Sequence, residues 1–254
     1  MVENNPWGLY DRLIEAIPEG IAVTDKVMGD NWTFVNAECG AGISHNVTYG
    51  SCVRTCENID DLDLKGLACL VKSWNFEEAT FGIAALNAWY SQPDKICALG
   101  GQIDESAEGG SKAKNPFDSL KPLYAGKRVA VIGHFPNVEA MADVCQLTVL
   151  ERVCNSPLDT PDGACEYLLP KQDFVFMTGT TFTNKTAVRL LQLAHDAFTV
   201  VTGPSSLPCQ ELIDAGANAI GGSAVVDPIA AREAIAEGNK PLWRSGIKKF
   251  YWEP

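Results

Sequence analysis

The chain has 254 residues, 46% of them hydrophobic, and a formal net charge of −12 at pH 7. This is enough apolar material for real cores in one large or two modest domains, and we expect two. The acidic balance argues against nucleic acid or an anionic membrane as a partner, because phosphate binding requires clustered Lys and Arg. We therefore expect a small-molecule ligand.

The first residues of the chain and the pattern of its cysteines indicate the cellular compartment. Met1 is followed by an acidic and polar segment rather than by a basic region and an apolar signal core, and no apolar run approaches the roughly 18 residues of a membrane span. The nine cysteines are scattered, odd in number and free of Cys-x-x-Cys pairs, which favours reduced thiols. We expect a cytoplasmic protein, and a homo-oligomer is compatible with the sequence.

The first ninety residues predict a helix, a hairpin and two further helices. Apolar residues at i, i+3, i+4 spacing mark the helices, and a turn-rich segment over residues 28–31 joins the two strands. The second of the later helices begins with an Asn75 cap. The expected elements are a helix over residues 4–17, strands over 21–27 and 32–36, and helices over 63–72 and 75–90.

Residues 36–46 predict a loop of small residues and the best candidate site in the N-terminal half. Gly40 and Gly42 allow backbone to approach a ligand or another backbone. A bulge or strand crossover is the alternative, and it is favoured without further evidence.

Asn87 lies in an apolar helix, where it must find hydrogen bonds if buried or face the other domain. Exposure is the simpler explanation for Asn87.

Residues 100–117 are rich in Gly, Ser and charge and lack an apolar period, so we expect a linker and place the domain boundary there, giving domains 1–110 and 111–254. From residue 126 onward, short apolar strands alternate with helical segments, which is typical of a doubly wound α/β sheet. Residues 243–254 should pack back on this body. The expected strands are 129–132, 147–150, 174–177, 199–201 and 219–220, with helices near 136–144, 163–169, 183–195, 207–215 and 228–237.

The stretch from Gly126 to Pro136 predicts a buried central strand, a tight turn and the start of a helix. Gly133, His134 and Phe135 form the turn, at the end of a strand where ligands of open α/β sheets bind. His134 is the only strand-end group that titrates near neutrality, so it is the candidate acid or base.

The same turn argues against NAD. A dinucleotide site requires Gly-x-Gly-x-x-Gly after the first strand, and only Gly133 is present, with Phe135 and Pro136 in the space that a pyrophosphate needs. Glu151 ends the second strand, where such folds often bind a ribose hydroxyl. A solvated strand-end acid explains Glu151 equally well.

The segment from Thr178 to Thr186 departs by one residue from a phosphate-binding P-loop, because Asn184 replaces the second glycine. We therefore do not expect ATP. The hydroxyls of Thr180, Thr181 and Thr183 with free N–H groups would suit an anion or a carbonyl. Simple helix capping by Thr181 or Thr183 is the alternative.

Residues 202–208 and 221–224 are two more small polar loops at strand ends, and four such loops on one rim predict a polar cleft. For a metal ion the candidates are thiols and imidazoles, whose spacing is not diagnostic. Buried thiols explain the cysteines as well. These candidates are Cys39, His45, Cys52, Cys56 and His134.

The quoted motifs carry a family resemblance. With the strand and turn of residues 129–136, Thr178-Gly-Thr-Thr, Asn184, Gly203-Pro-Ser and the glycine segment of residues 36–46, the chain resembles the bacterial and archaeal family named putative heavy-metal chelation domain. The resemblance implies an N-terminal α+β domain similar to the enolase N-terminal fold, a Rossmann-like domain with a mainly parallel sheet, and a cleft between them. It also implies chemistry on heterocyclic or chelating metabolites of pterin, flavin or siderophore type, with a heavy-metal ion as the candidate cofactor.

We accordingly expect a small-molecule enzyme that performs condensation or hydrolysis between the sheet rim and residues 40–45, with His134 as acid or base. A non-catalytic metal or metal-chelate binding protein is the main alternative, and an S-adenosylmethionine-dependent methyltransferase that uses Glu151 is another. The expected substrate-binding residues are Gly40, Gly42, His45, Asn87, Gly133, Phe135, Glu151, Gly179, Thr180, Thr181, Asn184, Gly203 and Ser205.

Overall fold

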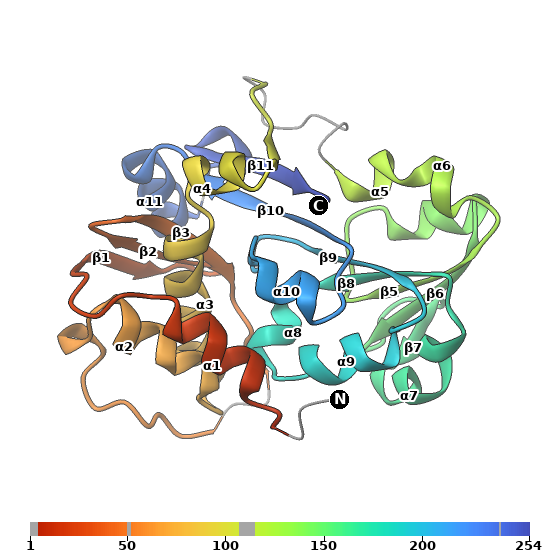
Figure 1. Ribbon diagram of the computed structural model, residues 1–254, viewed down its shortest axis with the longest axis horizontal. Helices are drawn as coiled ribbons and strands as arrows, with labels where there is room; N and C mark the ends of the chain where they lie inside the picture. Colours follow the sequence, from red (N-terminus) through yellow and green to blue (C-terminus); the bar gives the residue numbers. More distant parts are fainter. Residues whose placement is uncertain (1–4, 50–51, 107–114, 239) are drawn as a thin grey trace.

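The computed structural model describes residues 5–49, 52–106, 115–238 and 240–254. These residues form a three-stranded antiparallel sheet and an eight-stranded, mainly parallel sheet, each packed against helices (Figure 1). The mixed α/β class expected from the sequence is confirmed.

The small sheet is a meander in the order β1-β2-β3, and it lies between α3 and α11. Residues 36–46, expected as a loop, instead form the end of β2 and the whole of β3. The elements of this half are α1 (Gly8–Glu15), β1 (Val23–Met28), β2 (Trp32–Ala37), β3 (Gly40–His45), η1 (Ile59–Asp61), α2 (Leu64–Cys69), η2 (Leu70–Lys72), α3 (Phe76–Tyr90) and α4 (Pro93–Ala98).

The glycines of β3 let this strand lie directly on α3. A Cβ atom on Gly42 would stand 2.1 Å from the backbone nitrogen of Ala88 and 2.3 Å from the carbonyl oxygen of Ala84. Gly40 likewise contacts Gln92 and Ala88. Small residues here therefore allow close contact between a strand and a helix, rather than forming a loop.

Asn87 is fully buried, so its expected exposure is wrong. Its amide donates to the carbonyl oxygens of Ile43 and Pro204, at 2.9 and 3.2 Å, and its oxygen accepts from Ser91. A buried amide must be satisfied in this way. Asn87 thereby connects α3 and β3 to the loop that follows β9.

The large sheet has the order β4-β11-β10-β9-β8-β5-β6-β7. The strands from β7 to β10 pair in parallel. β11 pairs antiparallel with β10 on one side and with β4 on the other. Its strands are β4 (Gln102–Ile103), β5 (Arg128–Ile132), β6 (Gln146–Glu151), β7 (Asp159–Pro161), β8 (Phe174–Thr178), β9 (Phe198–Thr202), β10 (Ala219–Val225) and β11 (Ile247–Trp252).

The six parallel strands follow the order typical of doubly wound sheets. From β5 the chain proceeds toward one edge of the sheet through β6 and β7, and from β8 it proceeds toward the other edge through β9 and β10. The five strands expected in this half are confirmed, but β10 continues through residues 221–224, which were expected as a loop. β4, β7 and β11 were not predicted as strands. β4 has only two residues, β7 is polar and ends in Pro161, and β11 lies in the segment expected to pack as a tail. Residues 107–114 of the expected linker lie outside the described residues, and the domain division stays a prediction.

The helical segments are mostly short. The helix expected over 136–144 is a 3₁₀ segment that begins after Asn137, whose φ of 62° is left-handed. The elements are α5 (Pro116–Ser119), α6 (Lys121–Tyr124), η4 (Val138–Asp143), η5 (Asp162–Ala164), α7 (Cys165–Leu168), η6 (Leu169–Lys171), α8 (Thr180–Thr183), α9 (Ala187–Leu193), α10 (Gln210–Asp214), α11 (Pro228–Glu237) and η7 (Leu242–Arg244).

The two halves share their hydrophobic cores. Ala130 and Ile132 of β5 face a core that also contains residues of α1, α2 and α3, while Val129 and Val131 face a second core beneath α5 and α6. A third core joins the small sheet to α11 and to β10 and β11. This packing holds β3 against the end of the large sheet. Within the described residues, the helices are too short or too polar to cross a membrane.

Candidate functional site

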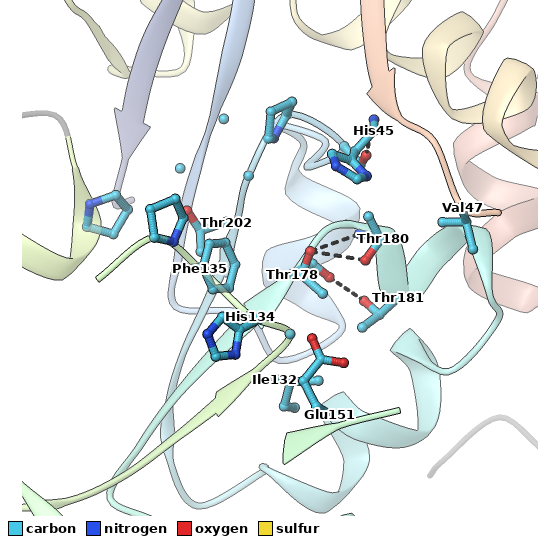
Figure 2. A pocket seen from close by; sticks show the side chains of 18 of the residues that line it. His45, Val47, Ile132, His134, Phe135, Glu151, Thr178, Thr180, Thr181 and Thr202 are labelled. Carbon is cyan, nitrogen blue, oxygen red and sulfur yellow. Dashed lines mark hydrogen bonds between the residues drawn. The ribbon is translucent and has the colours of Figure 1, made fainter. Parts of the chain in front are cut away.

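A cavity of about 820 Å³ lies at the carboxyl ends of the parallel strands β5, β8, β9 and β10. The turns after these strands form its floor, and His45 at the end of β3, together with Asn46, Val47 and Tyr49, forms part of its wall. Figure 2 shows His45 on one side of this cavity, His134 and Glu151 on the other, and the threonines of residues 178–181 between them.

The turns after β5 and β8 are neighbours because these two strands pair directly, with Ile132 opposite Met177. Gly133 has a φ of +94°, and a Cβ atom there would stand 2.8 Å from the side chain of Thr178. His134 and the segment after β8 therefore face one cavity. The sequence left this point open, because it did not determine the strand order.

His134 lies between two carboxylates. Its Nε2 atom is 3.0 Å from Glu139 Oε1, and its Nδ1 atom is 3.4 Å from Asp159 Oδ1. The Asp159 side chain is buried, and hydrogen bonds from the N–H groups of Ser156 and Asn155 hold the pKa of Asp159 below its ordinary value, with a smaller contribution from His134. The imidazole ring is thus fixed in place.

His45 ends β3 and presents the other imidazole of the cavity. Its Nδ1 atom is 2.9 Å from the carbonyl oxygen of Asn46, and the ring of Trp32 packs edge-on at 4.8 Å. Burial lowers the pKa of His45, and the hydrogen bond to Asn46 offsets part of this effect. The ring is therefore neutral at pH 7, with the proton on Nδ1 and the lone pair on Nε2.

Ser205 connects β3 to the loop after β9. Its Oγ atom accepts a hydrogen bond of 2.9 Å from the backbone N–H of His45 and lies 3.1 Å from Ser44 Oγ. Together with the hydrogen bond from Asn87 to Pro204, this contact fixes the position of His45 relative to the large sheet. Ser205 lines the cavity but is almost entirely buried.

The threonines after β8 are bonded to one another. Thr178 Oγ1 is 3.1 Å from Thr180 Oγ1, and Thr181 Oγ1 donates to the carbonyl oxygen of Thr178 at 2.7 Å. α8 and α9 have no side-chain cap, so neither Thr181 nor Thr183 has the capping role that was the alternative to a ligand site. Asn184 donates to the hydroxyl of Tyr49 at 3.2 Å, which connects α8 to the wall.

The structure brings most of the expected substrate-binding residues to the cavity. Gly179 does not line it, because its α-carbon packs on Ser205, and a Cβ atom there would stand 2.4 Å from the Ser205 carbonyl carbon. Gly40 and Gly42 of β3 and Asn87 of α3 do not line it either, because they lie where β3 packs against α3. The expected residues that line the cavity are His45, Gly133, His134, Phe135, Glu151, Thr180, Thr181, Asn184, Gly203 and Ser205.

The cysteine candidates lie away from the cavity. Cys39 is partly buried with its sulfur 3.8 Å from the carbonyl oxygen of Ala88, Cys52 is exposed, and Cys56 is partly buried. In the described part of the chain, no three His, Cys, Asp or Glu side chains are grouped so that they could hold a metal ion.

Sequence reasoning missed the aromatic and basic lining of the cavity. Trp32, Phe117 and Trp243 line it, and so does Lys249 of β11. These residues come from strands and turns that are distant in the sequence. No local pattern distinguishes them from ordinary core and surface residues.

Two family models match the chain, both described as "Putative heavy-metal chelation", one over residues 10–90 and the other over residues 115–250. A crystal structure of a protein of unknown function from Desulfitobacterium hafniense, a member of the second family, is 31% identical and covers 98% of both chains with a TM-score of 0.86. A relative from Pyrococcus horikoshii, 21% identical, has the same fold, with a TM-score of 0.76 over 97% of this chain and 98% of its own. An uncharacterized protein of Methanocaldococcus jannaschii is 28% identical over 189 residues, which are 72% of this chain and 68% of that protein.

Proposed function

The chain belongs to the family described as putative heavy-metal chelation, and from this premise we propose that it binds a flat heterocyclic chelating molecule together with its metal ion. The proposed site is the cavity at the carboxyl ends of β5, β8, β9 and β10. The protein would contribute one imidazole, His45, and the chelator would contribute the other metal ligands.

The supporting observation is a difference between the two histidines of the cavity in the nitrogen atoms that they can offer to a metal ion. The Nε2 atom of His45 has no hydrogen-bond partner among the described residues, whereas both nitrogens of His134 face carboxylates. Protein metal sites ordinarily supply at least three ligands, and the described residues offer no such group. A metal ion that arrives within a chelator needs only one open position filled by the protein.

The size and walls of the cavity agree with such a ligand. Small-molecule sites typically have volumes of roughly 300–1,000 Å³, and this cavity falls within that range. Trp32, Phe135 and Trp243 line it, and aromatic rings pack well against flat heterocycles. A bare metal ion would not require a cavity of this volume.

Calorimetry with nickel(II), pyridine-2,6-dicarboxylate and their one-to-one complex tests the proposal. The dicarboxylate is flat and tridentate, so its nickel complex keeps positions open for an imidazole. Exposed thiols would bind nickel themselves, so Cys52, Cys69, Cys97 and Cys154 are first alkylated. We expect one complex per chain, bound at least about tenfold more tightly than nickel alone. Equal affinity for the bare ion, or no binding of the complex, would contradict the proposal.

An enzyme that acts on the same ligand is the second candidate, because His134 is held as a catalytic histidine would be. Glu139, about half exposed, can move away from Nε2, while the buried Asp159 keeps the ring oriented. His134 would then transfer a proton during condensation or hydrolysis of the chelating metabolite. Methyl transfer has less support, since it rests only on the position of Glu151 at the cavity.

A comparison of wild-type protein with His134→Asn tests this second candidate. Each is incubated with a small-molecule extract, and mass spectrometry follows which heterocyclic acids disappear. Because general acid–base groups contribute roughly 10²–10⁴-fold, we expect conversion by the variant to be at least about a hundredfold slower. Equal rates in the two proteins would remove His134 from the chemistry.

A further inference from the structure

The antiparallel pair β10 and β11 presents two polar side chains to the cavity. Ser223 and Lys249 are directly opposite each other in the register of this pair, so they lie side by side on one face. Both line the cavity. Their neighbours along the same face, Val225 and Ile247, are in the core under α11. On this face of the sheet, the polar pair therefore lies next to the core and borders the cavity.

Lys249 has no acidic partner among the described residues. Its ammonium group lies 5.2 Å from the centre of the Trp243 ring, and none of the ion pairs between described residues includes it. The adjacent Lys248 instead donates to the carbonyl oxygen of Ser106. In a chain of net charge −12, an uncompensated cation beside a cavity favours an anionic ligand.

Ser223 provides an independent observation. The residue is 2% exposed, and its Oγ atom has no hydrogen-bond partner among the described residues. Buried hydroxyl groups in proteins are nearly always hydrogen-bonded, since an unmade bond is costly. The missing partner is accounted for if a ligand atom occupies the position beside Lys249.

We propose that Lys249 and Ser223 form a subsite for a carboxylate group, and that the ligand of the cavity is therefore an aromatic or heterocyclic carboxylic acid. This inference rests on the proposed function. Phosphate sites usually combine several cations or a row of backbone N–H groups, whereas this subsite has one ammonium group and one hydroxyl between aromatic rings. A monoanion matches one cation, and Trp243 supplies a surface for the attached ring.

Two nickel complexes of similar shape test the subsite. Pyridine-2,6-dicarboxylate and 2,2′:6′,2″-terpyridine are both flat and tridentate, but only the first bears carboxylates. Calorimetry with Lys249→Met should show the dicarboxylate complex bound at least about tenfold more weakly, because a charge-assisted hydrogen bond is lost. The terpyridine complex is cationic, so its affinity should be unchanged or higher. Ser223→Ala should weaken only the dicarboxylate complex.

Lys171→Met is the matched control, since Lys171 is exposed, lies outside the cavity and carries the same charge. Unchanged binding of the terpyridine complex shows that each variant is folded. If Lys249→Met weakens both complexes equally, or neither, the subsite is wrong while the metal-chelate function stands. If wild-type protein binds neither complex, the proposed function itself has failed. Displacement by inorganic phosphate but not by acetate would also overturn the carboxylate assignment.

Discussion

Replacement of Gly42 by alanine is expected to destabilise the protein by about 3 kcal/mol or more. The added Cβ atom would stand 2.1 Å from Ala88 N, 2.3 Å from Ala84 O and 2.5 Å from the carbonyl carbon of Asn87. All three are backbone atoms of α3, so no side chain can move aside. β3 would have to separate from the helix, which would also break the hydrogen bond from Asn87 to Ile43.

Urea unfolding followed by circular dichroism measures this effect. Gly163→Ala is the matched control, because a Cβ atom at Gly163 meets no atom within 4 Å and its backbone is not left-handed. The control should change the free energy of unfolding by less than about 1 kcal/mol. Equal stability of the two variants would show that β3 does not lie on α3 as described.

The glycines of β3 also show what the sequence could and could not reveal. Gly40 and Gly42 stood out as positions of close backbone approach, and this part of the interpretation is confirmed. Whether the approaching group was a ligand or a helix depended on packing between distant segments. Periodicity describes one segment at a time, so it predicted a loop where a strand lies against α3.

The strands of the large sheet were easier to predict where they are apolar and buried. β5, β8 and β9 are short β-branched or aromatic runs of this kind. β7 and β11 were missed because their polar residues lack that pattern. The omission had consequences for the site, since Asp159 of β7 is the buried partner of His134, and Lys249 belongs to β11.

The two cavity histidines illustrate the same limit. Both were candidates from the sequence, with His134 as the acid or base and His45 as a substrate or metal ligand. Their hydrogen-bond partners distinguish them, and those partners are a backbone carbonyl for His45 and two carboxylates from other segments for His134. The carbonyl belongs to the next residue, Asn46, but neither the side-chain conformation that reaches it nor the approach of Asp159 to His134 can be read from spacing.

Replacement of His45 by alanine is expected to weaken binding of the nickel pyridine-2,6-dicarboxylate complex by about a hundredfold. The carbonyl of Asn46 fixes the proton on Nδ1, so Nε2 is already oriented and deprotonated for a metal ion. The other imidazole of the cavity is a poorer ligand, because both nitrogens of His134 face carboxylates and the buried Asp159 holds its ring in place. The backbone N–H of His45 still reaches Ser205 in the variant, so the fold should be kept.

The affinities of wild-type protein, His45→Ala and His195→Ala for this complex, measured side by side by calorimetry after alkylation of exposed thiols, test the central claim most directly. His195 is an exposed histidine outside the cavity and controls for surface coordination of nickel. We predict tight one-to-one binding by wild-type protein and His195→Ala, and a loss of about a hundredfold for His45→Ala with unchanged circular dichroism. Equal affinity of all three proteins for the complex would contradict the assignment of the metal-chelate site to this cavity.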